Sequence, residues 1–204
     1  MGSPSLLVFL TALIWITLCW AHSNWKIFDP DQEESVEKFL ALWPPSQVPK
    51  SEYAWIYVPG SQGTIDAGDV HGLMAEWNHL DSIGACTQQM LNKLAEKYNV
   101  VSGKWMIYLK SFEVDEGWNR IARAVTSGDV GVAAKVEPYS PTEINHCICV
   151  YASNIFDHKE VRDLRQHLRQ MGFDKVLEFK PDAYTHVGIY PGNKWNIPEG
   201  MYRE

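Results

Sequence analysis

The chain has 204 residues and a formal net charge of −7 at pH 7, with 18 basic side chains against 25 acidic ones. This length is that of one ordinary domain and allows a sizeable apolar core. The acidic balance disfavours a protein that binds nucleic acid through a broadly basic surface, although it leaves room for a local basic groove. The sequence contains nine tryptophans and no visible repeat or low-complexity run.

The segment 6–20 is an uncharged apolar run that ends just before Ala21. It has the length of a signal-peptide core and is short for a membrane span, which needs about 20 residues. We therefore expect residues 1–21 to direct the chain to the secretory pathway, with cleavage near Ala21 and no stable membrane span beyond the leader. A cytoplasmic location is the alternative, because no Lys or Arg precedes the run and no Asn-x-Ser/Thr site occurs.

The remaining residues, 22–204, are expected to form a single α+β domain. In its first part, apolar residues spaced three or four apart indicate helices, and apolar residues at alternate positions indicate strands. In chain order these patterns predict an irregular arm at 24–30, a helix at 36–43, a strand at 53–58, a helix at 70–80 and a helix at 86–98.

The stretch 102–136 has the clearest pattern in the chain. Alternating apolar residues predict a strand over 104–109, and helical spacing predicts a helix over 115–127 that Asp115 can cap. Gly128 follows the last apolar residue of that helix, where a left-handed terminal residue is expected. A second strand is predicted over 130–136.

The last part of the chain is predicted to hold a strand at 146–151, a helix at 157–171 that begins at Asp157 and ends at Gly172, and an irregular tail from 195. Two further strands are predicted at 176–179 and 185–190. Strands joined by short links pair antiparallel. The pattern therefore indicates an α+β protein with a curved antiparallel sheet backed by helices on one face.

Seven short blocks along the chain resemble the basophilic leukaemia expressed protein family, which has a domain of unknown function. They are Ser102-Gly103-Lys104-Trp105, Ala122-Arg123-Ala124, Ala134-Lys135-Val136, Cys149-Val150-Tyr151, Lys180-Pro181-Asp182, Gly188-Ile189-Tyr190 and Asn193-Lys194-Trp195. The resemblance covers roughly residues 53–202. That family is similar in fold to translation initiation factor 4E, which binds the messenger-RNA cap, so the resemblance implies this fold here.

The cap chemistry of that factor does not carry over residue by residue. The factor stacks a methylated guanine between two Trp rings, and cation–π attraction stabilises the stack. The loop 59–65 of this chain has no aromatic residue, and the segment 97–102 has no Trp-Glu pair. The only cationic side chains between residues 152 and 159 are His158 and Lys159. We expect a binding module without the cap-stacking Trp pair.

His146, Cys147 and Cys149 are the residues most suggestive of a metal. Side chains alternate across a strand, so His146 is expected to point away from the two cysteines, and no second ligand cluster exists in the sequence. We therefore expect neither a metal nor a cofactor. The two cysteines are expected to stay free, because their side chains stand roughly parallel on one strand.

His186 lies near Asp182 and could act as a base, but no nucleophile motif accompanies it. Basic and aromatic residues gather more clearly in the family-like blocks. They could hold an anion or an RNA backbone and offer stacking surfaces. The candidate ligand-binding residues are Lys104, Trp105, Trp118, Arg120, Arg123, Lys135, Lys194 and Trp195. The competing interpretation places the tryptophans in the core and pairs the cations with acidic residues.

The leading functional expectation is a non-enzymatic binding module for RNA or a nucleotide-like ligand. The first alternative is a protein–protein interaction domain, which predicts an exposed apolar patch. The second is an uncharacterised enzyme that uses His186 or His146.

Overall fold

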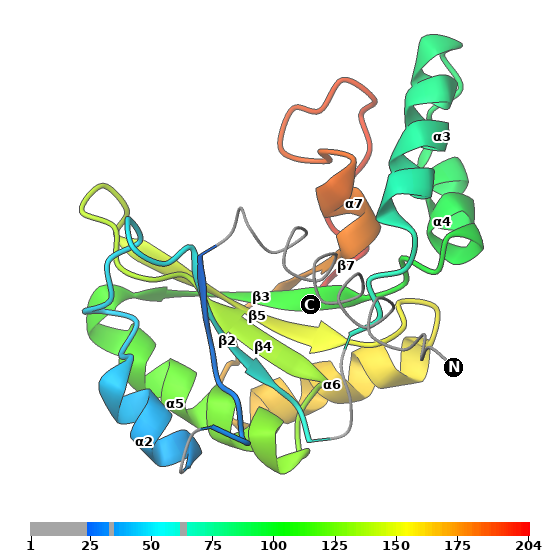
Figure 1. Cartoon of the computed structure of the whole chain (residues 1–204). Coiled ribbons are helices and arrows are strands. Elements are labelled where there is room, and N and C mark those ends of the chain that lie inside the picture. Colours follow the sequence, from blue (N-terminus) through cyan, green and yellow to red (C-terminus); the bar gives the residue numbers. More distant parts are fainter. Residues whose placement is uncertain (1–23, 33–34, 62–64) are drawn as a thin grey trace, which may run out of the picture.

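A computed structural model of the chain describes residues 24–32, 35–61 and 65–204. The expected leader and its cleavage site near Ala21 lie outside the described residues. None of the helices among the described residues has both the length and the apolar character needed to cross a membrane. The structure is α+β, with one sheet through the middle of the molecule and helices against it (Figure 1).

Seven strands form an open mixed sheet. In the order in which they lie side by side they are β1 (Trp25–Ile27), β2 (Trp55–Pro59), β4 (Ala133–Val136), β5 (Asn145–Ala152), β3 (Gly103–Lys110), β6 (Glu178–Pro181) and β7 (Tyr202–Arg203). β1 is parallel to β2, and all other neighbours are antiparallel. The predicted antiparallel sheet is thus confirmed apart from β1, which replaces part of the irregular arm expected at 24–30.

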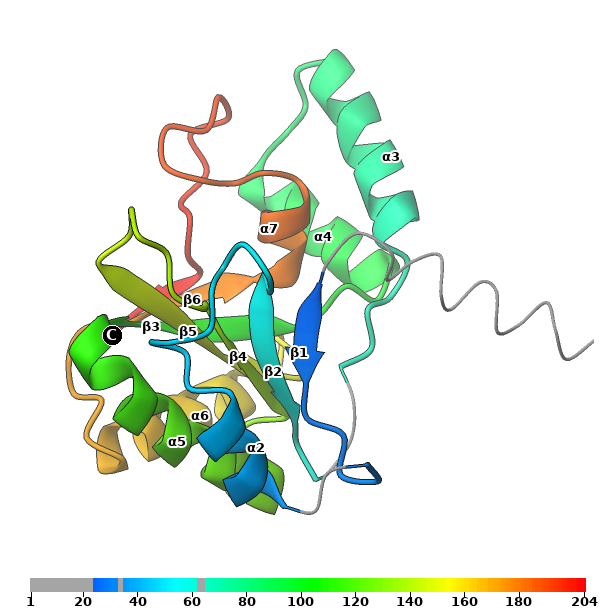
Figure 2. The same ribbon diagram turned by 60° about the vertical axis from the view of Figure 1, so that its left-hand side comes forward.

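Three helices cover one face of the sheet (Figures 1 and 2). They are α2 (Val36–Leu42), α5 (Ser111–Ser127) and α6 (His158–Gln170). The main core lies between them and the sheet and includes Trp105, Trp118, Ile148 and Phe179, each at most 1% exposed. The expectation of a sheet backed by helices on one face is confirmed for these three helices.

The other helices rise from the opposite side of the sheet, at the end near β6 (Figures 1 and 2). These are α3 (Val70–Ser82), α4 (Gln88–Lys97) and α7 (Asp182–His186). They pack on one another around a second core that contains Trp77, Leu91 and Tyr184. We refer to α3, α4, α7 and residues 187–201 as the upper helical unit. The sequence pattern predicts all helices on one face of the sheet, whereas the helices of this unit lie on the opposite side.

The central unit is confirmed in outline: β3 is followed by α5, and Gly128 ends α5 with a φ of 86°. Two details differ from the prediction. The helix begins at Ser111 rather than at Asp115, whose carboxylate instead accepts bonds from Ser46. The strand predicted over 130–136 is β4 and begins at Ala133, and β5 lies between it and β3 in the sheet.

The strand predicted at 185–190 is wrong. Pro181 ends β6, and the chain then turns into the short helix α7, in which Asp182 occupies the first turn. Gly188, with a φ of 82°, redirects the chain into the loop that follows. The alternation of apolar residues over 185–190 reflects packing of Val187 and Ile189 against the second core rather than pairing in the sheet.

Candidate binding pocket on the open face

The sheet face opposite α2, α5 and α6 carries a row of lysines and aromatic residues, and we call it the open face. Side chains alternate across a strand, so Lys104 points away from the core that holds Trp105. Strand pairing places Lys104 directly between Tyr151 and Lys180. It also places Lys135 opposite Cys149 on the neighbouring strands. Residues from four strands therefore meet on one surface.

A pocket of about 230 Å³ lies on this face. Its walls are Trp55, Lys104, Met106, Tyr108, Lys135, Glu137, Cys147, Cys149, Lys180, Thr185 and Tyr190. Three lysines and a single carboxylate line it, and that carboxylate, Glu137, pairs with Lys50 at 3.4 Å. The pocket is therefore locally cationic on a chain whose net charge is −7. A local field of this kind attracts small anions.

Lys104 is buried and paired. Its ammonium group bonds the carboxylate of Asp182 and the hydroxyl of Thr185, the latter at 2.8 Å. Ser102 donates a further hydrogen bond of 2.5 Å to Asp182. Burial alone would raise the pKa of Asp182, but the Lys104 charge and these bonds outweigh it and hold that pKa below its ordinary value. Asp182 therefore fixes α7 to β3 as an ion pair.

Lys135 has no carboxylate or other hydrogen-bond partner among the described residues. Its ammonium lies 4.0 Å from the ring centroid of Trp55, 4.8 Å from that of Trp25 and 5.8 Å from that of Tyr151. Burial lowers the pKa of this lysine, although the neighbouring Cys149 acts in the opposite direction. Cation–π contacts compensate only part of the lost hydration. Lys135 is thus the cation of the pocket that most lacks an anion.

Lys180 completes the group. Its ammonium donates a bond of 2.6 Å to the carbonyl of Ile189 and lies 3.7 Å from the ring centroid of Tyr190. Burial, followed by the nearby charge of Lys104, lowers the pKa of Lys180. One neutral acceptor does not neutralise its charge, so an anion in the pocket would gain from two incompletely compensated lysines.

Two cysteines line the pocket floor. The sulfurs of Cys147 and Cys149 lie 3.8 Å apart, and both thiols are free. The bond from Cys147 lowers the pKa of the Cys149 thiol against the effect of burial, and the same bond raises the pKa of Cys147. Cys149 is therefore the more acidic thiol of the pair. The expectation of buried, unbridged cysteines agrees with this geometry.

Among the eight residues singled out from the sequence, only Lys104 and Lys135 line the pocket on the open face. Trp105 and Trp118 lie in the main core, 1% and 0% exposed, and present no ring face to a ligand. Arg120 donates to the carbonyl of Met171, and Arg123 makes two 2.7 Å bonds to Glu37. Both arginines are on the helical side of the sheet.

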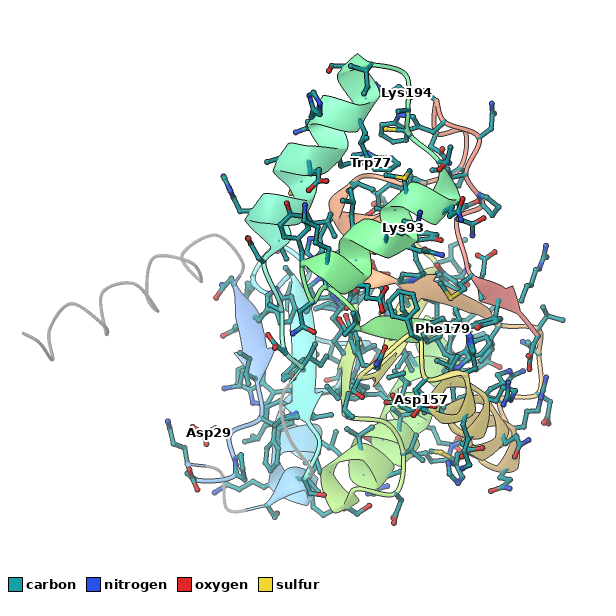
Figure 3. All side chains as sticks on the ribbon, turned by 90° about the vertical axis from the view of Figure 1, so that its right-hand side faces the viewer. Asp29, Trp77, Lys93, Asp157, Phe179 and Lys194 are labelled. Atoms are coloured by element: carbon teal, nitrogen blue, oxygen red, sulfur yellow. The ribbon has the colours of Figure 1, made fainter. Side chains whose placement is uncertain are left out.

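Lys194 and Trp195 belong to the upper helical unit. Both bond the carboxylate of Asp81, at 2.6 and 2.7 Å, and Trp195 packs edge-on against Trp77. Figure 3 shows Trp77 on α3 and Lys194 at the far end of this unit. Neither residue lines the pocket on the open face.

The two histidines considered as bases differ in setting. His146 is 1% exposed, and its ring bonds Ser111 at 2.9 Å and the carbonyl of Glu137 at 2.8 Å. It faces away from Cys147 and Cys149, as predicted, and fastens the start of α5 to β5. Burial lowers the pKa of His186, which borders a small recess beside Trp77. Among the described residues, no group of three or more His, Cys, Asp or Glu side chains is placed to hold a metal.

Sequence reasoning did not include Lys180, Trp55 and Tyr151 among the site residues. Each of the three points to the same face of the sheet as Lys104 and Lys135. Alternation of side chains within β2, β5 and β6 is the sequence pattern that could have indicated this. That signal becomes useful only when the pairing of the strands is known, because the paired residues Lys104 and Lys180 are 76 positions apart in the chain.

The pocket lysines lie in the part of the chain that matches a known family. Residues 66–188 match the model of the family described as basophilic leukemia-expressed protein Bles03. The match spans more than half of the chain. The protein belongs to this family. Lys104, Lys135 and Lys180 fall inside the matched region of the Bles03 family, whereas Trp55 and Lys194 fall outside it.

Proposed function

We propose that this member of the Bles03 family is a non-enzymatic binding module that holds the phosphate end of a nucleotide-like ligand in the pocket on the open face. The observation that carries the proposal is Lys135, a half-buried lysine that faces a pocket and has no anion among the described residues. Lys180 and Lys104 line the same pocket from the paired strands β6 and β3. A phosphate would receive charge-assisted bonds from Lys135 and Lys180, because Lys104 already pairs with Asp182.

The dimensions of the pocket favour a small portion of a ligand. A volume of about 230 Å³ is below the ~300–1,000 Å³ of typical small-molecule sites. The phosphate would therefore enter the pocket, while the base lies across Trp55 or Tyr190 at its edge. RNA, the other form of this ligand class, would place one backbone or terminal phosphate at the same position.

Titration of the purified protein with inorganic phosphate, mononucleotides and a short single-stranded RNA tests the proposal. Lys135→Met should weaken binding at least about tenfold, because one desolvated charge-assisted bond contributes 1.5–3 kcal/mol, roughly. Lys194→Met is the matched control and should leave binding unchanged. RNA binding should decrease strongly with salt, and mononucleotide binding less so. Equal affinities for the wild type and Lys135→Met would refute the assignment.

Lys135→Met should still fold. It removes cation–π attraction of about 1–2 kcal/mol and also the cost of burying the charge, so the two effects largely offset each other. Thermal unfolding of the variant checks that a loss of binding is not a loss of structure.

A second candidate function is protein–protein interaction. A groove of about 570 Å³ lies beside the end of β3 and the start of α5. Phe112 and Val176 border it and are 81% and 66% exposed. Exposed apolar groups of this size are common where proteins bind each other. A photo-crosslinker at Phe112 should then capture one defined partner that a crosslinker at Tyr139 does not capture.

We further propose that the sheet and its three backing helices are a variant of the translation initiation factor 4E fold. An open, largely antiparallel sheet with α2, α5 and α6 on one face supports this proposal. Fold similarity alone would not assign cap binding.

A further inference from the structure

Sulfur atoms gather on the open face beside the lysines. Cys147 and Cys149 are two residues apart on β5, and their sulfurs are 3.8 Å from each other. Met106 lies directly opposite Cys149 on β3 and packs in the same small cluster. Directly opposed side chains have Cβ atoms about 4.5–5.5 Å apart. Two thiols and one thioether from adjacent strands therefore share one side of the pocket.

We propose that Cys147, Cys149 and Met106 form a three-sulfur site for a soft monovalent metal ion, with Cu(I) as the ion that fits. Metal–thiolate bonds are about 2.3 Å long, so two sulfurs on one ion can be up to about 4.6 Å apart, which includes the observed separation. Thiolate and thioether ligands select Cu(I), whereas structural zinc requires four ligands. The sulfurs line the same pocket as the lysines, but the metal proposal does not rest on nucleotide binding.

The charges around the sulfurs suit this ion. Lys135 lies directly opposite Cys149 and lines the same pocket as both thiols. When Cu(I) binds, each thiol releases its proton to solvent, and two thiolates with one Cu(I) form a complex that carries one negative charge. The ammonium of Lys135 compensates that charge, and no change of oxidation state is needed.

The aromatic neighbours close the site from one side. The hydroxyl of Tyr108 lies 3.8 Å from the Met106 sulfur, and both cysteines are at most 6% exposed. The pocket nevertheless reaches the sulfurs, because Met106, Cys147 and Cys149 are all part of its wall. A small ion has an entry path, and bulky oxidants or thiols have little access.

Competition for Cu(I) between the full chain and a chromogenic chelator, under anaerobic and reducing conditions, tests the site. The background is the chain with Cys19→Ser and Cys86→Ser, so that Cys147 and Cys149 are its only cysteines. We expect one copper per chain and X-ray absorption from sulfur neighbours alone. Cys149→Ser should abolish retention, and Met106→Leu should weaken it at least about tenfold, the lower end of the range for groups that support a metal.

Met74→Leu is the matched control, because this methionine is exposed on α3 and should not affect copper. Met106→Leu conserves volume, and its thermal unfolding should match the background. Retention of copper by Cys149→Ser, or equal affinities for Met106→Leu and Met74→Leu, would overturn the three-sulfur site. Copper retention is measured in the absence of nucleotide, so its outcome does not depend on the proposed function.

Discussion

Some buried charges on the open face stabilise the fold, and others weaken it. Lys104 is buried, and its charge is neutralised by Asp182. Lys135 stands on the next strand but one and lacks such a partner among the described residues. Buried charges without partners are costly, and binding sites are where proteins retain them. The contrast between these two lysines separates the structural role of Lys104 from the binding role proposed for Lys135.

Replacing Lys104 should destabilise the protein in a pH-dependent way. In Lys104→Met the Asp182 carboxylate stays buried without its cation, which should cost about 3–5 kcal/mol at pH 7. The wild-type pKa of Asp182 is below its ordinary value. The pair therefore stabilises the fold above the unfolded pKa of about 3.9 and loses this effect as pH falls through the lower folded value.

Denaturant unfolding at pH 7 and near pH 4 measures this effect. The deficit of Lys104→Met should shrink at the lower pH, where its buried carboxyl takes up a proton. Lys159→Met removes the exposed pair with Asp163 and should cost less than about 1 kcal/mol at either pH. A deficit of the same size at both pH values would count against the buried ion pair.

At the scale of elements, the spacing of apolar residues predicted most helices and strands. Local polar residues marked the starts of some helices but not of others. Thr87 and Asp157 cap α4 and α6 with their side chains. α5, in contrast, begins after Lys110 without a side-chain cap. Asp115 seemed to be that cap, but its partner is Ser46, which is 69 positions earlier in the chain. Contacts at that separation leave no local pattern.

Asp115→Ala should therefore cost more than the loss of a surface carboxylate. Asp115 accepts bonds of 2.9 Å from the Ser46 amide and 2.5 Å from its hydroxyl, and it joins the turn after α2 to α5. Bonds to a charged acceptor are worth about 1.5–3 kcal/mol. Denaturant unfolding should show a loss of this size. Glu116→Ala, the neighbouring exposed position, should stay within about 0.5 kcal/mol, and equal losses would contradict this role.

At the scale of the whole molecule, two apolar cores meet through few residues. The main core lies beneath the sheet, and the second lies within the upper helical unit. Phe156 packs against both. Regions with their own core open as separate cooperative units when few contacts join them. We expect the upper helical unit to open before the sheet.

Trp77→Ala provides the test of this independence. Trp77 is 2% exposed and packs against Trp195 in the second core, so its truncation should cost about 3–5 kcal/mol locally. Hydrogen exchange should then show fast exchange in α3 and α4 while β5 stays protected. In Trp118→Ala, which removes a residue of the main core, protection should decrease throughout. Uniform loss in both variants would show a single cooperative unit.

The same division explains how much the sequence could predict. The hydrophobic pattern predicted β3, α5, α6 and the α+β class, because each depends on neighbours within a few residues. It did not predict α7, the order of the strands or the meeting of Lys135 with Trp55. Those features depend on residues far apart in sequence. The candidate site was accordingly found at two lysines and missed at the residues that surround them.

The loop 187–201 has a consequence for the lifetime of the protein in a cell. It bonds Lys180 through Ile189 and holds Asp81 of α3 through Lys194 and Trp195. Residues 190–192 of this loop are exposed, and exposed loop segments are preferred sites of proteolytic cleavage. A single cut there would detach a wall of the pocket and the support of α3 while the main core stayed folded. Proteases would thus cut the molecule at this loop well before they degraded its sheet.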